Sequence, residues 1–132
     1  MKENINEFET DMSAGEAASL FQRAVKKRPL KLKIAPFKFF TPTPNEDPFA
    51  EVDGSIEPDF AVGAIFQFPG PDPAMGSVIM SCLKQDNGIR VLLTSTGNIR
   101  GRVVSNSLLN HILGEFQSAD SGIVVDRYTG RR

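Results

Sequence analysis

The fold is decided by residues 78–93, which read VIMSCLKQDNGIRVLL. Apolar and β-branched side chains fill residues 78–83 and again residues 89–93, and Asn87-Gly88 lies between the two runs. An Asn-Gly pair between such runs is a strong signal for a hairpin, because a tight primed turn needs positive φ angles that these residues tolerate. The stretch therefore predicts two antiparallel strands joined by a turn at Asn87-Gly88.

Further strands are expected on both sides of this hairpin. Residues 60–68 are almost entirely apolar, which is typical of a central strand. Residues 30–34 alternate apolar residues with lysines and predict a half-buried strand. Because Pro36 has no amide to donate, this strand is an edge or bulges there before Phe37, Phe39 and Phe40 resume the apolar face. Residues 99–103 alternate apolar residues with arginines and predict a third strand after the hairpin, and residues 123–125 predict a short last strand.

Two helices are expected around these strands. Ser13 and Glu16 have the spacing of a capping box, and the apolar residues that follow line one helical face until Pro29. Ser105 or Asn106 can cap the second helix. The expected buried face of that helix consists of Leu108, Leu109, Ile112, Leu113 and Phe116. These patterns predict an α+β fold in the order α-β-β-β-β-β-α-β, with two helices and a mostly antiparallel sheet of five to six strands.

Two segments lie outside this pattern in a chain of 132 residues, a length that suits one domain. Residues 1–12 are polar and acidic, so we expect a mobile arm, because they bury too little apolar surface to offset the entropy of ordering. Residues 41–59 contain four prolines and show neither helical nor strand periodicity. Loops of this length are often functional, so this acidic loop is a candidate recognition element within a single domain of residues 13–132.

Charge is distributed unevenly along the chain. The 15 basic and 16 acidic residues nearly cancel, yet residues 23–38 hold seven basic residues and no acid, and residues 39–77 hold seven acids and no base. A whole-chain average says nothing about the electrostatic field at one face. Two interpretations stay open: the acidic loop covers the basic segment, or the basic segment is open to an acidic partner.

The candidate binding residues are these charged side chains. Lys31 and Lys33 share one face of a predicted strand, as do Arg100 and Arg102, so the four cations converge if both faces lie on one side of the sheet. The basic set is Arg23, Lys26, Lys27, Lys31, Lys33, Lys38, Arg100 and Arg102. The acidic loop contributes Glu46, Asp47, Glu51, Asp53, Glu57 and Asp59. Cations at a helix end and lysines on an edge strand also have purely structural roles.

Residue types that carry catalysis or bind metal are scarce. His111 is the only histidine and lies one position off the apolar face of its helix, which is typical of boundary packing. Cys82 is the only cysteine and alternates with buried positions of its strand, so we expect a small buried hydrophobe. The carboxylate pairs lack the spacing of a calcium loop, and no phosphate-binding loop is present. We expect no enzyme, no cofactor and no metal site.

The sequence favours a non-enzymatic protein-interaction or assembly module, whose basic and acidic surfaces guide docking of a protein partner or a second copy. The alternative is a nucleic-acid-binding protein that contacts phosphates through the basic sheet face. The alternative lacks interleaved aromatic residues for base stacking, since there is one tyrosine, no tryptophan, and the phenylalanines fall mainly where a core is expected. No apolar run approaches the roughly 18 residues of a membrane span, and the N-terminal residues are too acidic for a signal peptide, so we expect a cytoplasmic protein.

Overall fold

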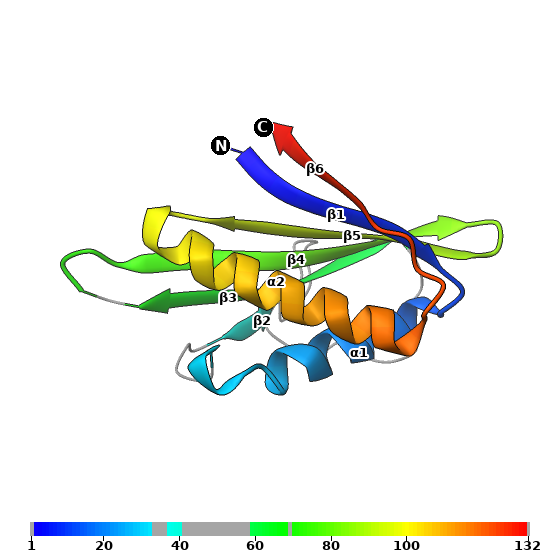
Figure 1. Cartoon of the computed structure of the whole chain (residues 1–132), viewed down its shortest axis with the longest axis horizontal. Coiled ribbons are helices and arrows are strands. Elements are labelled where there is room, and N and C mark those ends of the chain that lie inside the picture. The colour runs from blue at the N-terminus through cyan, green and yellow to red at the C-terminus, as the bar shows by residue number, and fades with distance from the viewer. Residues whose placement is uncertain (1, 33–36, 41–58, 69, 132) are drawn as a thin grey trace.

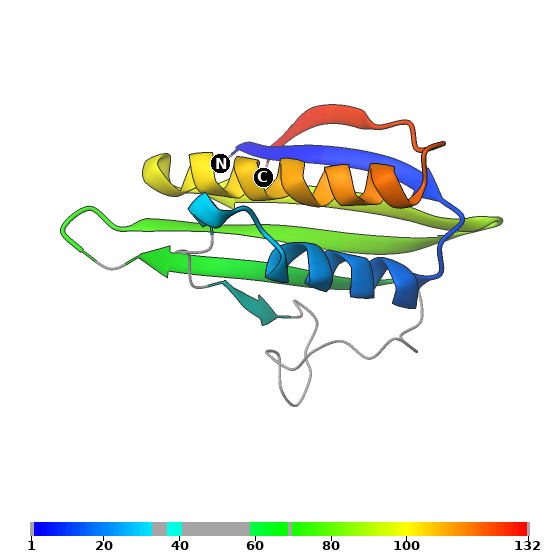
Figure 2. The ribbon, with the colours of Figure 1, turned by 60° about the horizontal axis from the view of Figure 1, so that its bottom comes forward.

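Antiparallel strands form one six-stranded sheet in the computed structural model, which describes residues 2–32, 37–40, 59–68 and 70–131. The strands lie side by side in the order β2-β3-β4-β5-β1-β6. Helices α1 and α2 cover the same face of this sheet (Figures 1 and 2). In chain order the elements are β1 (Lys2–Thr10), α1 (Ala14–Lys26), the 3-10 helix η1 (Leu30–Leu32), β2 (Lys38–Phe40), β3 (Phe60–Phe68), β4 (Ala74–Gln85), β5 (Gly88–Gly97), α2 (Ile99–Ala119) and β6 (Asp126–Arg131).

The predicted fold class is confirmed: this is an α+β fold with a six-stranded antiparallel sheet and two helices. The order of elements is β-α-β-β-β-β-α-β, so it differs from the prediction at its start. The core lies between the sheet and the two helices, because alternate side chains of β3, β4 and β5 point towards the helices and are buried. The predicted face of the second helix is buried as well, at Leu108, Leu109, Ile112, Leu113 and Phe116.

The first helix begins where the sequence predicts. Ser13 is the N-cap residue, and its Oγ accepts a hydrogen bond from the backbone amide of Glu16 at 3.1 Å. This bond satisfies one of the amides that lack a partner at a helix start.

The predicted hairpin is confirmed, although its turn differs from the expected type. Strands β4 and β5 pair from Gly76↔Gly97 to Gln85↔Gly88. Gly88 has a φ of 120°, whereas Asn87 is not among the described residues with positive φ. Only the glycine therefore needs the left-handed region, as in a type I turn followed by a glycine bulge, and the expected primed turn is wrong.

The expected mobile arm at residues 1–12 is wrong, because Lys2–Thr10 form β1 in the interior of the sheet. Strand β1 pairs with β5 on one side and with β6 on the other. Phe8 points into the core and packs on Phe116, with ring centroids 5.2 Å apart. The backbone hydrogen bonds of two neighbouring strands stabilise a segment whose composition is too polar to predict a central strand.

The expected edge strand is wrong at its start, because Leu30–Leu32 form η1, and it is confirmed at its continuation, where Lys38–Phe40 form the edge strand β2. Residues 33–36 lie outside the described part of the chain. The side chain of Arg28 donates to the carbonyl oxygens of Val25 at 2.9 Å and Leu32 at 3.0 Å. These bonds fold the chain back over the end of α1, so the apolar alternation here does not mark a strand.

The strand expected at residues 99–103 is wrong as well, since α2 begins at Ile99 with Asn98 as its N-cap. Ser105 and Asn106, the expected caps, lie inside this helix. The last strand covers Asp126–Arg131 instead of residues 123–125.

Candidate binding surfaces

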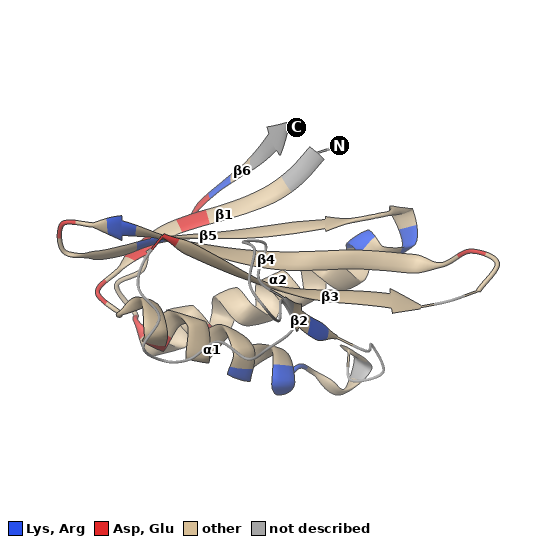
Figure 3. Ribbon diagram, turned by 180° about the vertical axis from the view of Figure 1, so that it is seen from behind, with Lys and Arg blue, Asp and Glu red and all other residues tan. Residues whose placement is uncertain are grey.

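The structure separates the predicted basic residues into two groups (Figure 3). One group lies at the end of α1 and on β2, and the other lies on the first turn of α2. Arg100 and Arg102 are therefore on a helix, Lys31 is on η1, and Lys33 lies outside the described residues. These four cations therefore do not converge on one face of the sheet, and that expectation is wrong.

The end of α1 is joined to β2 by cation–π contacts. Lys26 Nζ lies 6.0 Å from the ring centroid of Phe39, and the Arg28 guanidinium lies 5.1 Å from that of Phe37. Lys38 alternates with Phe39 on β2, so its side chain points away from α1, to the sheet face that carries Ile65 and Ser77. Within the described residues the exposed side chains of Arg23, Lys27 and Lys38 form no ion pair.

A groove of about 810 Å³ lies between β2 and the start of α2. Its apolar lining includes Ile65, Phe66 and Met75, and its polar lining includes Lys38 and Asn98. No acidic side chain is among the described residues that line it. The groove therefore combines apolar surface with one positive charge, and it lies where four strands and a helix start meet.

Asn98 fixes the helix start beside this groove. Its Oδ1 accepts from the amides of Gly101 at 2.8 Å and Met75 at 3.2 Å, and its Nδ2 donates to the carbonyl oxygen of Pro73 at 2.7 Å. A side-chain carbon at Gly101 would collide with the backbone of Met75, so a glycine is needed for this close approach. The start of α2 is thus bound to the residues that open β4.

The first turns of α2 expose apolar side chains to solvent. Ile99 is 85% exposed and Val103 is 70% exposed, and the two lie one turn apart on the same helical face. Arg102 is exposed beside them, while Arg100 pairs with Asp72 at 3.3 Å. We call Ile99, Arg102 and Val103 the α2 tip.

The two arginines of this turn do not stabilise the helix. The first turn of α2 holds no acidic residue, although the positive end of the helix dipole favours anions there. The structural role of cations at a helix end applies to Lys26 and Lys27 on α1, and not to Arg100 and Arg102. The position of Arg100 is explained by its ion pair with Asp72. Arg102 forms no ion pair with a described residue.

The acidic residues of the loop lie almost entirely outside the described residues. This holds for Glu46, Asp47, Glu51, Asp53 and Glu57. Asp59 is described and has a structural role: its Oδ1 accepts from the backbone amide of Lys84 at 3.1 Å, and its own amide donates to the carbonyl oxygen of Cys82 at 2.8 Å. It holds the entry of β3 against β4.

Cys82 and His111 have the packing roles expected of them. Cys82 is fully buried on β4, and burial raises the pKa of its thiol from 9.0 to about 12. His111 is half-buried on α2, with its Nε2 3.0 Å from the carbonyl oxygen of Ala24 on α1. In the described part of the chain no cluster of three His, Cys, Asp or Glu side chains is placed to hold a metal ion.

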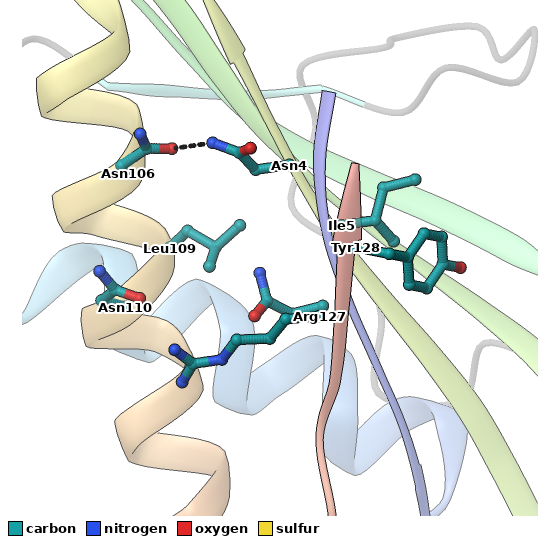
Figure 4. Close-up of a pocket in the computed structure, with 8 residues that line it drawn as sticks. Asn4, Ile5, Asn106, Leu109, Asn110, Arg127 and Tyr128 are labelled. Atoms are coloured by element: carbon teal, nitrogen blue, oxygen red, sulfur yellow. Dashed lines mark hydrogen bonds between the residues drawn. The ribbon is translucent and has the colours of Figure 1, made fainter. Parts of the chain in front are cut away.

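A second hollow, of about 350 Å³, lies between β1, β6 and α2 (Figure 4). We call it the amide cleft, because four asparagines line it together with Leu109 and Arg127: Asn4, Asn6, Asn106 and Asn110. None of these residues was among the sequence candidates. A signal was present in the spacing, since asparagines two apart share a strand face and asparagines four apart share a helix face.

Among the described helices none is both long and apolar enough to cross a membrane. No protein family, curated protein or solved structure matches this chain.

Proposed function

We propose that this protein is a non-enzymatic protein-interaction module that docks an acidic segment of a partner protein across the groove and the α2 tip. The observation that carries the proposal is the exposure of Ile99 and Val103 on the first turns of α2, whose N-cap Asn98 lines an apolar groove together with Lys38. An exposed apolar patch next to cations, with no described acid at the site other than Asp72, has the composition of a docking surface.

The apolar side chains supply the affinity. Complete burial of a valine or isoleucine contributes about 1.5–3 kcal/mol, and Met75 adds to this because it is 42% exposed. Such side chains are well suited to the centre of an interface, where a few residues dominate the binding energy. Exposed cations such as Lys38 and Arg102 act mainly on the association rate and on the choice of an acidic partner.

We propose a separate protein as the occupant, and binding of a second copy of the chain is an outcome that the test distinguishes. Three acidic side chains of the described surface are already paired within the chain, since Glu7 and Glu9 contact Arg90 at 3.3 and 3.0 Å and Asp72 contacts Arg100. Nucleic acid fits less well, because the cations do not follow one face and Phe37 and Phe39 are half-buried against α1. Binding of a second copy and binding of nucleic acid are distinguishable outcomes of the test below.

The test is capture of a partner from native extract on immobilised protein, with and without nuclease. We expect wild type to retain a protein that survives nuclease treatment, and retention to fall at higher salt because exposed charges are screened. The variants Ile99→Ser/Val103→Ser and Lys38→Glu/Arg102→Glu should each lose it.

Matched controls lie elsewhere on the surface. Val124 is 80% exposed and Lys84 is exposed on β4, so Val124→Ser and Lys84→Glu remove comparable groups away from the groove. Both controls should retain the partner. Loss of the partner in the controls as well, or its release by nuclease, would contradict the proposal, and capture of the chain itself would point to self-assembly.

A further inference from the structure

The amide cleft has a wall of asparagines beside a core that is mainly apolar. Asn4, Asn6 and Phe8 alternate along the face of β1 that points to α2, and Asn106 and Asn110 lie one turn apart on α2. Asparagine is unfavourable in strands and in helix interiors, so four of them around one hollow lower the stability of both elements. At Phe8 the same interface is closed by packing on Phe116.

The hydrogen bonds of the cleft leave amide donors available. Asn106 Oδ1 accepts from Asn4 Nδ2 at 3.0 Å (Figure 4) and from Ser95 Oγ at 2.7 Å. Both lone pairs of this oxygen are therefore used, and its orientation is fixed. The two N–H groups of Asn106 remain to donate, and Asn4 Oδ1 remains to accept.

Asn6 is the most unusual residue of the cleft. It is only 5% exposed, it lines the cleft, and its side chain has no hydrogen-bond partner within the described part of the chain. Its amide atoms are open to the cleft, since they are not among the fully buried side-chain atoms that lack a partner, which are Gln22 Nε2 and Arg90 Nε in the described residues. A ligand in the cleft would supply the missing partner.

Arg127 adds a positive charge beside Asn6. The two residues are directly paired across β1 and β6, so their side chains lie on the same face of the sheet. Figure 4 shows the guanidinium reaching from β6 towards Asn110 on α2. Arg127 forms no ion pair with any described residue, and no acid is among the described residues that line the cleft.

We propose that the amide cleft binds a small carboxylate that carries hydroxyl groups, such as a sugar acid or another hydroxy acid. The planar guanidinium of Arg127 matches a carboxylate with two parallel hydrogen bonds. Amide side chains both donate and accept, which is also what a hydroxyl group does. A volume of about 350 Å³ lies at the lower end of small-molecule sites, so the ligand is small. The cleft lies further along α2 than the α2 tip, and the two proposals use different residues.

The test is a titration of ¹⁵N-labelled protein with gluconate, with glucose and inorganic phosphate as the other probes. Gluconate should shift the side-chain amide signals of Asn6 and Asn106, with a dissociation constant of about 1 mM for a ligand of this size. Glucose lacks the carboxylate and phosphate lacks the carbon-bound hydroxyl groups, so each should bind about tenfold or more weakly.

Two variants separate the parts of the site. Arg127→Gln should weaken gluconate about 10- to 100-fold, as expected for loss of hydrogen bonds to a charged group, while Lys84→Gln, at an exposed position on β4 away from the cleft, should leave it unchanged. Asn6→Leu should abolish binding without lowering the unfolding midpoint, because the Asn6 side chain makes no hydrogen bond to the described residues that would be lost and leucine is no worse than asparagine in a strand. If no probe shifts the amide signals, or phosphate binds as well as gluconate, or Arg127→Gln has no effect, the proposal is wrong.

Discussion

Replacing Asn98 by alanine should destabilise the protein more than the same replacement of any other helix-cap residue. Asn98 makes three hydrogen bonds, to the amides of Gly101 and Met75 and to the carbonyl oxygen of Pro73. Loss of an N-cap costs about 1 kcal/mol, and each further bond contributes about 1 kcal/mol where water does not replace it. The Met75 amide is exposed and the other two contacts are part-buried, so we expect a loss of about 2–3 kcal/mol.

This loss is measured by urea unfolding followed by circular dichroism. For a chain of this size it corresponds to a fall of about 8–12 °C in the melting temperature. Asn98→Asp keeps the cap oxygen but loses the donor to Pro73, so it should cost about 1 kcal/mol or less. Asn110→Ala is the matched control, because Asn110 is exposed on the same helix and alanine has the higher helix propensity.

A value for Asn98→Ala within about 0.5 kcal/mol of wild type would refute this reasoning, since surface exchanges without a structural role fall in that range. The start of α2 would then be held by something other than Asn98, and the wall of the groove would not depend on it.

Four further outcomes follow from the same structure. Ser13→Ala should lower the free energy of unfolding by about 1 kcal/mol through loss of the bond to the Glu16 amide, and an unchanged urea midpoint would show that the cap is dispensable. Gly88→Val should be strongly destabilising, because valine resists the φ of 120° and its Cβ would meet the carbonyl oxygen of Thr10; normal thermal unfolding of this variant would contradict the turn assignment. Cys82 should resist thiol reagents at pH 8 until the protein is unfolded, so rapid labelling of native protein would place it at the surface. Because its pKa rises from 9.0 to about 12 on folding, its contribution to stability is complete below pH 9 and is lost as the pH approaches 12, which pH-dependent urea midpoints of wild type and Cys82→Ala will show.

Local patterns were sufficient to predict the centre of the fold. The apolar runs around Gly88 predicted strands β4 and β5, and residues 60–68 predicted β3 with its observed bounds. The capping box at Ser13 predicted the start of α1. In each case the residues that decide the structure are neighbours in the sequence, so their spacing carries the information.

The errors arose where distant contacts decide the structure. Strand β1 is polar and is held by pairing with β5 and β6 from the other end of the chain. The five residues that begin α2 alternate in polarity, but Ile99 and Val103 also have the spacing of one helical turn, so the pattern fits both structures. The bonds of Asn98 to Met75 and Pro73 favour the helix, and a sequence pattern does not reveal contacts between residues more than twenty positions apart.

The candidate site was predictable only in its residue types. Basic side chains were expected to bind a partner, but their grouping on a sheet face was wrong because Arg100 and Arg102 lie on a helix. The groove brings Lys38, Ile65 and Met75 together from three strands, and no local signal marks such a meeting. The amide cleft had a signal in the spacing of its asparagines, which only gains meaning once β1 and α2 are known to face each other.

Site-specific photo-crosslinking tests the docking surface most directly. A photoreactive amino acid is placed at Gln67, which is exposed and lines the groove, and for comparison at Gln117, which is exposed near the other end of α2. Irradiation in native extract should give a discrete protein adduct from Gln67 that survives nuclease, that disappears in the Ile99→Ser/Val103→Ser background, and that is absent from Gln117. Equal adducts from both positions, or none from Gln67, would contradict the proposal that the groove and the α2 tip dock a partner protein.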